Sequence, residues 1–187
     1  MKKLSSLIAA VLVGSAILSV AGCSAFKVKL IDEKAYFEAL EKNAGISKKD
    51  TLVHEKNSTY DGHDVEYVTF TDQDGSSFCY IRYKDADDAM DEFMITYDSL
   101  EDLLDDGTFE GSNKRMINND QGYILLDGSV EEGTAFAGMT FFTGDTHYYG
   151  GYYVNNNVYI EILTLDGSKS DKEMIDAMLK ELDLPTP

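Results

Sequence analysis

The chain has 187 residues, of which 34 are acidic and 16 are Lys or Arg, so its formal net charge at pH 7 is −18. A surface this acidic repels polyanions, which argues against a nucleic-acid partner. The length suits a single domain, since domains contain roughly 50 to 250 residues and one near 150 residues buries ~70% of its unfolded surface.

The first residues have the layout of an export signal. Lys2 and Lys3 precede an apolar run from Leu7 to Val20, which is about 14 residues long. A helix needs ~20 apolar residues to cross a bilayer, so a secretory signal is favoured over a spanning anchor.

The end of this signal carries a processing motif. The sequence Val20-Ala21-Gly22-Cys23 resembles the lipobox of type II signal peptides, in which an aliphatic residue and two small residues precede an invariant cysteine. The resemblance implies a thioether-linked diacylglycerol on the Cys23 sulfur, cleavage before Cys23, and amino-acylation with a fatty acid such as palmitate. The alternative is an ordinary cysteine behind a type I signal.

Lipidation of Cys23 would place the protein on the extracytoplasmic face of a membrane, because two acyl chains anchor a protein stably. In a cell with two membranes, Ser24 stands where an Asp would retain a lipoprotein at the inner membrane, which implies the outer membrane. Residues 1–22 contain two lysines and no acid, so the processed chain would carry a net charge of −20. Residues 23–31 are expected to be a linker and residues 32–187 one domain. About eight residues span at most ~26 Å, so the linker would hold the domain close to the membrane.

The spacing of apolar residues predicts two helices in the first part of this domain. Asp32 to Ala44 begins with an N-cap residue and ends before Gly45. Asp85 to Leu104 has an apolar stripe at spacings of three and four, and Gly107 supplies its stop.

Runs of β-branched and aromatic residues predict the strands. The glycine-containing link of residues 72–76 indicates a hairpin, and Asn155-Asn156-Asn157 indicates a tight one because Asn tolerates positive φ. Residues 50–56 fit either a short strand or a loop. The predicted strands are Asp64–Thr71, Ser77–Lys84, Arg115–Asn118, Gly122–Asp127, Thr134–Thr143, His147–Val154 and Val158–Leu165.

The chain closes with a predicted helix from Asp171 to Leu182, where Ser170 and Glu173 form a capping box. Strands grouped without helices between them imply an antiparallel sheet with about three helices packed on it, an α+β fold. This element order is similar to that of the photosystem-associated PsbP-like folds, in which helices flank an antiparallel sheet. The amino-terminal part and the hairpin-then-helix segment also resemble the small uncharacterised lipoproteins of Gram-positive bacteria, which implies a location and no chemistry.

No catalytic, metal or cofactor motif emerges from the spacing of reactive residues. Cys79 would have no disulfide partner once Cys23 is acylated, and its apolar run predicts a buried, inert thiol. His54, His63 and His147 lack the spacing of a zinc site. The loop at residues 72–76 is interpreted as a polar turn, because alignment with a calcium loop would put apolar residues at two ligand positions.

Three tyrosines form the candidate binding surface. Tyr148 and Tyr152 share one face of a strand with Gly150 between them, and Tyr159 faces them across the Asn turn. If that face is open, the tyrosines make a platform for a sugar or a peptide. The alternative is a sheet covered on both faces, with the tyrosine hydroxyls reaching the rim.

The sequence therefore predicts a membrane-anchored, non-enzymatic binding or interaction module of the cell envelope. The alternative is an envelope hydrolase whose site is assembled only in three dimensions. A third hypothesis is a structural or immunity-type lipoprotein whose acidic face engages a basic partner.

Overall fold

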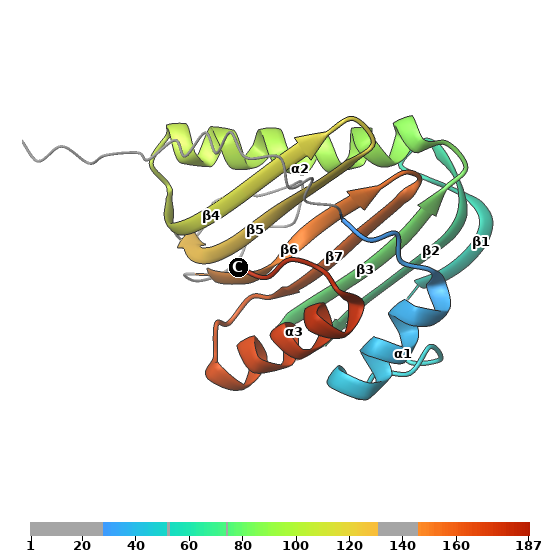
Figure 1. Ribbon diagram of the computed structural model, residues 1–187, viewed down its shortest axis with the longest axis horizontal. Helices are drawn as coiled ribbons and strands as arrows, with labels where there is room; N and C mark the ends of the chain where they lie inside the picture. Colours follow the sequence, from blue (N-terminus) through green and yellow to red (C-terminus); the bar gives the residue numbers. More distant parts are fainter. Residues whose placement is uncertain (1–27, 52, 74, 131–145) are drawn as a thin grey trace, which may run out of the picture.

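The computed structural model describes residues 28–51, 53–73, 75–130 and 146–187. A seven-stranded antiparallel sheet runs through the molecule in the order β1-β2-β3-β7-β6-β5-β4, and three helices pack on it (Figure 1). The predicted α+β class is therefore confirmed. The elements are α1 (Glu33–Ala44), β1 (Val53–Tyr60), β2 (His63–Gln73), β3 (Ser76–Tyr83), α2 (Ala86–Asp105), β4 (Phe109–Asn118), β5 (Gln121–Val130), β6 (Thr146–Asn155), β7 (Val158–Thr164) and α3 (Lys169–Leu182).

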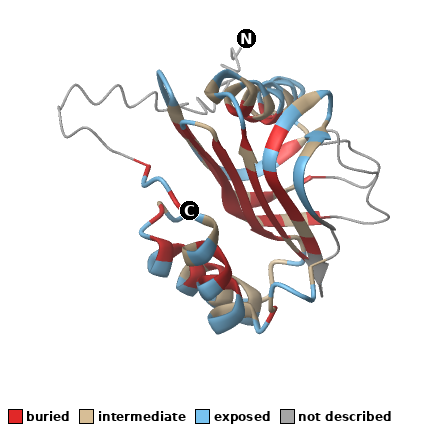
Figure 2. Cartoon of the chain, turned by 90° about the vertical axis from the view of Figure 1, so that its right-hand side faces the viewer, coloured by how far each residue is buried: buried red, intermediate tan, exposed pale blue. Residues whose placement is uncertain are grey.

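Helices cover both faces of the sheet, as Figure 2 shows. Residues of α1 and α3 share one core cluster with the sheet, including Leu40 and Met178. Residues of α2 share a second cluster with the opposite face, including Phe93 and Leu100. Every residue of β7 is buried, because this central strand has strands on both sides and helices above and below.

Different turns lie at the two ends of the sheet. The near end holds the β1–β2, β4–β5 and β6–β7 turns, at residues 61–62, 119–120 and 156–157. The far end holds the β2–β3 turn and the first residues of β6 and α3. A ten-residue strand rises about 3.4 Å per residue, so the two ends lie roughly 30 Å apart.

The first described residues are part of the domain, although they fall within the expected linker of residues 23–31. Val28 and Ile31 are buried in the cluster shared by α1 and α3. At the near end, the Val28 amide donates to Gln121 Oε1 at 3.0 Å, and Asn155 Nδ2 donates to the Val28 carbonyl at 2.5 Å. Ile31 precedes the N-cap Asp32, where an apolar residue commonly packs against the first turns of a helix.

The structure corrects the predicted start of the last helix. Its N-cap is Ser168, whose Oγ accepts a hydrogen bond from the Asp171 amide at 3.2 Å, and the predicted cap Ser170 lies in the first turn. Both serines precede an acidic residue by three positions, so the sequence pattern fits twice. Gly167, with φ +66°, directs the chain into the helix at Ser168.

Other local predictions hold or fall outside the described residues. Asp32 and Gly45 bound α1 as expected, and Asn155 pairs with Val158 across a two-residue turn. Residues 50–56 lead into β1, while the predicted strand Thr134–Thr143 lies outside the described residues. No helix in the described part of the chain combines the length and apolar character that a membrane crossing requires.

Candidate functional site

The tyrosines predicted as a binding surface lie in the core. Tyr148 and Tyr152 have exposures of 1% and 0%, and Tyr159 has 4%. All three belong to the cluster that α2 covers, and Thr96 of α2 lies 3.5 Å from the Tyr159 hydroxyl. The prediction of an open platform was therefore wrong. The sheet is covered on both faces, as in the alternative, but the hydroxyls of Tyr148 and Tyr152 are buried and do not reach the rim.

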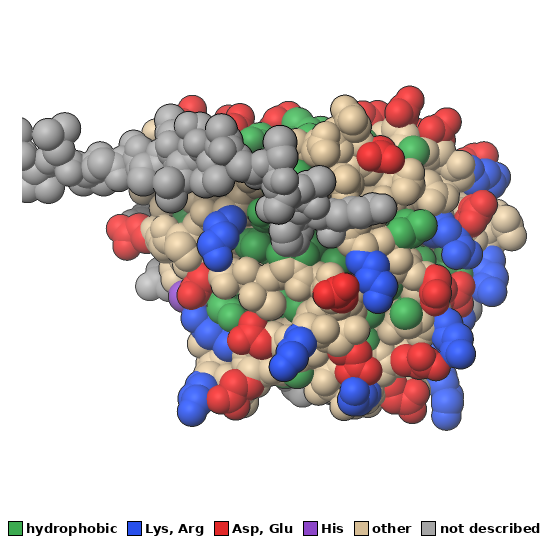
Figure 3. Space-filling model, in the orientation of Figure 1, with side chains coloured by type: hydrophobic (Ala, Val, Ile, Leu, Met, Phe, Trp, Pro, Cys, Tyr) green, Lys and Arg blue, Asp and Glu red, His purple; other side chains and the backbone are tan. Residues whose placement is uncertain are grey.

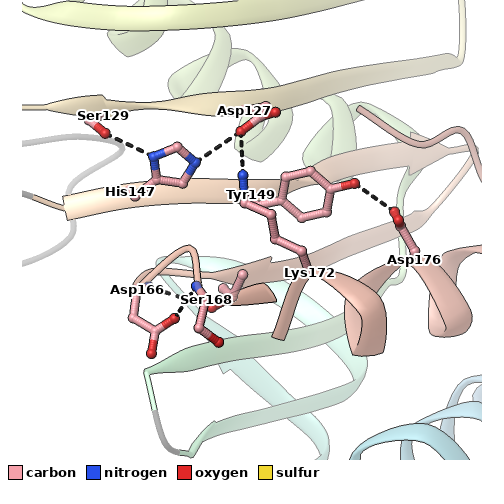
Figure 4. Close-up of polar contacts among 9 residues, drawn as sticks. Asp127, Ser129, His147, Tyr149, Asp166, Ser168, Lys172 and Asp176 are labelled. Atoms are coloured by element: carbon pink, nitrogen blue, oxygen red, sulfur yellow. Dashed lines mark hydrogen bonds and ion pairs between the residues drawn. The ribbon is translucent and has the colours of Figure 1, made fainter. Parts of the chain in front are cut away.

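A polar cluster lies on the opposite face, at the far end of the sheet. We call Asp127, Ser129, His147 and Lys172 the His147 cluster (Figure 4). The β5–β6 register pairs Ser129 with His147. Asp127 lies two residues before Ser129, so its side chain points to the same face. Lys172 reaches this face from the first turns of α3.

The imidazole of His147 joins a hydroxyl to a carboxylate. Ser129 Oγ lies 2.9 Å from its Nδ1, and Asp127 Oδ1 lies 2.9 Å from its Nε2. An ionised carboxylate can only accept, so this network assigns the proton of neutral His147 to Nε2. Nδ1 then accepts from the Ser129 hydroxyl.

Lys172 connects the cluster to α3. Its Nζ donates to Asp127 Oδ1 at 2.8 Å and lies 4.7 Å from the centre of the Tyr149 ring. The Tyr149 hydroxyl donates to Asp176 Oδ1 at 2.8 Å, one turn further along α3. These contacts fasten α3 to β5 and β6.

Backbone packing restricts the His147 ring from the α3 side. A Cβ added at Gly167 would lie 2.5 Å from the imidazole, closer than real Cβ contacts come. Gly167 also has φ +66°, a region that other residues rarely adopt. The glycine therefore permits both the turn into α3 and the position of His147.

Charge in the cluster lowers the pKa of Asp127. The hydrogen bond from Lys172 makes the largest contribution, and the bond from His147 adds to it. A carboxyl whose pKa is lower in the folded state stabilises the fold above its unfolded pKa, and that stabilisation is lost as the pH falls.

We expect Asp127→Asn to lower the free energy of unfolding at pH 7 by up to about 1 kcal/mol, because the side chain is 39% exposed and solvent screens its ion pair. Urea titrations from pH 7 downwards should show the difference shrinking below about pH 4, where the wild-type carboxyl becomes protonated. Glu173→Gln, which removes an exposed partner of Lys169, is the matched control and should change stability little at any pH. A constant deficit across the pH range would contradict this assignment.

The contacts of the His147 cluster permit two roles. A histidine between a hydroxyl and a carboxylate is the arrangement that activates a serine nucleophile. The same contacts also hold α3 on the sheet, because Asp127 Oδ1 is shared between His147 and Lys172.

A second candidate surface is the outer side of α2. Ala86–Asp105 contains eight acidic residues and no basic one, and the flanking residues Asp85 and Asp106 are also acidic. α1 and α3 together carry seven acidic and five basic residues. Figure 3 shows acidic and basic side chains interspersed on the side of α1 and α3. The charge is thus segregated between the two faces of the molecule.

Of the remaining predicted residues, Cys79 lies apart from these surfaces and His63 contacts α2 through Asp88. Cys79 is buried, and desolvation raises the pKa of its thiol well above the usual value. His63 Nδ1 lies 2.8 Å from Asp88 Oδ1, at the opposite end of the sheet from His147. Within the described residues, no group of three or more His, Cys, Asp or Glu side chains is placed to hold a metal ion. Cys23 and the side chain of His54 lie outside the part described.

Asp127, Ser129 and Lys172 were not predicted as site residues. Asp127 and Ser129 flank Gly128 in a strand, and this pair of polar residues was the available signal. Their partner His147 lies at the start of a later strand, and the length of the connection does not indicate the β5–β6 register. Comparison with known proteins adds no relative to this description: no family model, curated protein or solved structure matches the chain.

Proposed function

We propose that this chain is a lipid-anchored, extracytoplasmic interaction module of the cell envelope that binds a basic partner through the outer side of α2. The lipobox-like sequence ending at Cys23 supports the anchor. The observation that carries the binding role is the acidic pattern of α2, which works against the stability of the helix.

That pattern has a physical cost. Asp98 and Asp102 are four residues apart, as are Glu101 and Asp105, and like charges at this spacing destabilise a helix by about 0.2–0.5 kcal/mol per pair. The last turns also hold acids and no base, where the helix dipole favours cations. Arg115 of β4 pairs with Glu101, at 3.2 Å.

In α1 and α3, by contrast, charged residues four apart carry opposite charges. In α1, Lys34 lies 3.5 Å from Glu38, and in α3, Lys169 lies 3.6 Å from Glu173, both with the favourable four-residue spacing. Local patterns that oppose stability are most often found at functional sites. Cations supplied by a partner would relieve the repulsion along α2, and Ile95, 50% exposed on this helix, would give the contact an apolar centre.

Photo-crosslinking in intact cells tests this role. A benzophenone amino acid at Ile95 of the full chain should form an adduct, whereas the same group at Ala177, an exposed position of α3, should not. Adding Asp91→Asn, Asp98→Asn and Asp102→Asn should abolish the adduct. These three changes remove repulsion, so the variant should keep or gain stability. Equal adducts at both positions, or an adduct that survives the three changes, would sink the proposal.

The contacts of His147 favour a second candidate function, an envelope hydrolase with Ser129 as nucleophile. Asp127 and His147 supply the carboxylate and the base that such a nucleophile needs, with both distances at 2.9 Å. The ring nitrogens are exchanged relative to the serine-protease triad, because Ser129 bonds Nδ1 and Asp127 bonds Nε2. Asp127 Oδ1 is also bound by Lys172, which favours the structural role for the same contacts.

A fluorophosphonate probe separates the two roles. A hydrolase would label at Ser129, and His147→Ala would reduce the labelling by orders of magnitude. For the interaction module we expect no labelling above that of Ser129→Ala, with circular dichroism confirming that both proteins are folded.

A further inference from the structure

We infer that the domain lies on an anionic bilayer with its α1 and α3 side and Leu30 toward the head groups, so that α2 faces outward. This inference rests on the proposed lipid anchor at Cys23. Beyond the anchor, it specifies which side of the domain contacts the lipid.

The length of the tether limits how far the domain can move from the membrane. Five Cα–Cα steps separate Cys23 from Val28, and an extended chain covers at most about 18 Å over them. Val28 is buried between the sheet and the α1 and α3 layer, so the chain enters the domain on that side. The side where the chain enters is therefore held near the bilayer surface.

Charge decides which side can approach the lipid. Electrostatic interactions reach about 8–10 Å at physiological ionic strength, so only the layer next to the head groups is affected. The layers of α2 and of α1 and α3 lie roughly 20 Å apart, at ~10 Å for each packed layer. An inward α2 would bring a helix with eight acidic residues and no basic one to an anionic surface, with Arg115 of β4 as a partner for Glu101. The opposite helices bring a net charge of −2.

The residues beside the entry point suit a contact with head groups. Leu30 is the most exposed large hydrophobic residue described, at 51%, and Lys29 beside it is also exposed. Asp183, the C-cap of α3, lines the same surface pocket as Lys29 and Leu30, so this acid lies beside the contact in any orientation. The end-on alternative is less favourable because it also brings Asp120, which is exposed in the β4–β5 turn, to the head groups.

Fluorescence quenching on vesicles tests the orientation. The chain from Cys23 is coupled through the Cys23 thiol to a maleimide lipid in vesicles of phosphatidylcholine and phosphatidylglycerol. A dye is attached at an unnatural amino acid placed at Ile95 or at Ala177, and nitroxide head groups serve as the quencher. Cys79 is buried and should not compete for the maleimide, which a coupling reaction on Cys23→Ala checks.

The dye at position 177 should be quenched several-fold more than the dye at position 95. The difference should shrink in about 1 M salt, where the screening length falls to ~3 Å. Leu30→Gln should reduce quenching at position 177, whereas Ile117→Gln, at a residue exposed by 40%, should not. Equal quenching at the two positions, or stronger quenching at position 95, would overturn the orientation. Because the anchor is attached chemically in the vesicles, that result would not bear on whether Cys23 is lipidated in cells. Conversely, failure to label Cys23 in cells would refute the proposed anchor without changing the vesicle result.

Discussion

We expect Cys23→Ala to abolish incorporation of alkyne-tagged palmitate and to leave the signal of residues 1–22 uncleaved. The reason is that the diacylglycerol and the cleavage implied by the lipobox-like sequence both depend on the Cys23 sulfur. In the processed wild-type chain the lipid supplies nearly all of the membrane affinity, because two acyl chains anchor a protein stably and each buried CH₂ contributes about 0.8 kcal/mol. The expected change is from full labelling to background.

The second cysteine is the matched control for this experiment. Cys79→Ala should retain full labelling, because Cys79 is buried in the sheet and no acyl chain could be attached to it there. Label that persists in Cys23→Ala would refute the lipoprotein assignment. Label that is lost in Cys79→Ala would place the modified cysteine in the folded domain.

Tyr152→Ala should destabilise the fold by about 3–5 kcal/mol, the cost of removing a buried aromatic ring from a packed core. Tyr152 is fully buried under α2, and its loss leaves a cavity next to Tyr148 and Tyr159. For a domain of this size, 1 kcal/mol corresponds to about 2–4 °C in Tm, so the Tm should fall by roughly 6–20 °C.

Urea denaturation compares this variant with Tyr123→Ala, which removes a tyrosine that is only half-buried beside the other core cluster. The Tyr123 variant should lose clearly less stability, because less apolar surface returns to water. A folded Tyr152→Ala protein with an unchanged urea midpoint would mean that α2 does not cover the tyrosines. In that case the open platform would have to be reconsidered.

Helices and turns were predictable because their determinants lie within a few residues of each other. Asp32 caps α1 and Gly45 ends it, and Asn156 takes φ +51° in the β6–β7 turn. The cap of α3 shows the limit of such patterns, since Ser168 and Ser170 fit the same motif. The bonds of the Asp171 amide and the backbone at Gly167 distinguish them.

The order of the strands in the sheet was harder to predict from the sequence. β3 pairs with β7, which places Phe78 beside Ile162, far away in the sequence. That pairing makes β7 central and requires helices on both faces. The alternation of Tyr148 and Tyr152 was visible in the sequence, but whether a helix covers their face depends on where the distant α2 packs.

From the sequence alone follow the acidic charge, the antiparallel α+β class, the bounds of most helices and the lipobox-like segment before Cys23, because each depends on composition or on neighbouring residues. The tertiary structure alone placed the tyrosines in the core, brought Asp127, Ser129 and Lys172 to His147, and separated the acidic α2 from the mixed charges of α1 and α3. These features depend on strand register and on which sheet face each helix covers, and both are decided by the packing of residues that are far apart in the chain.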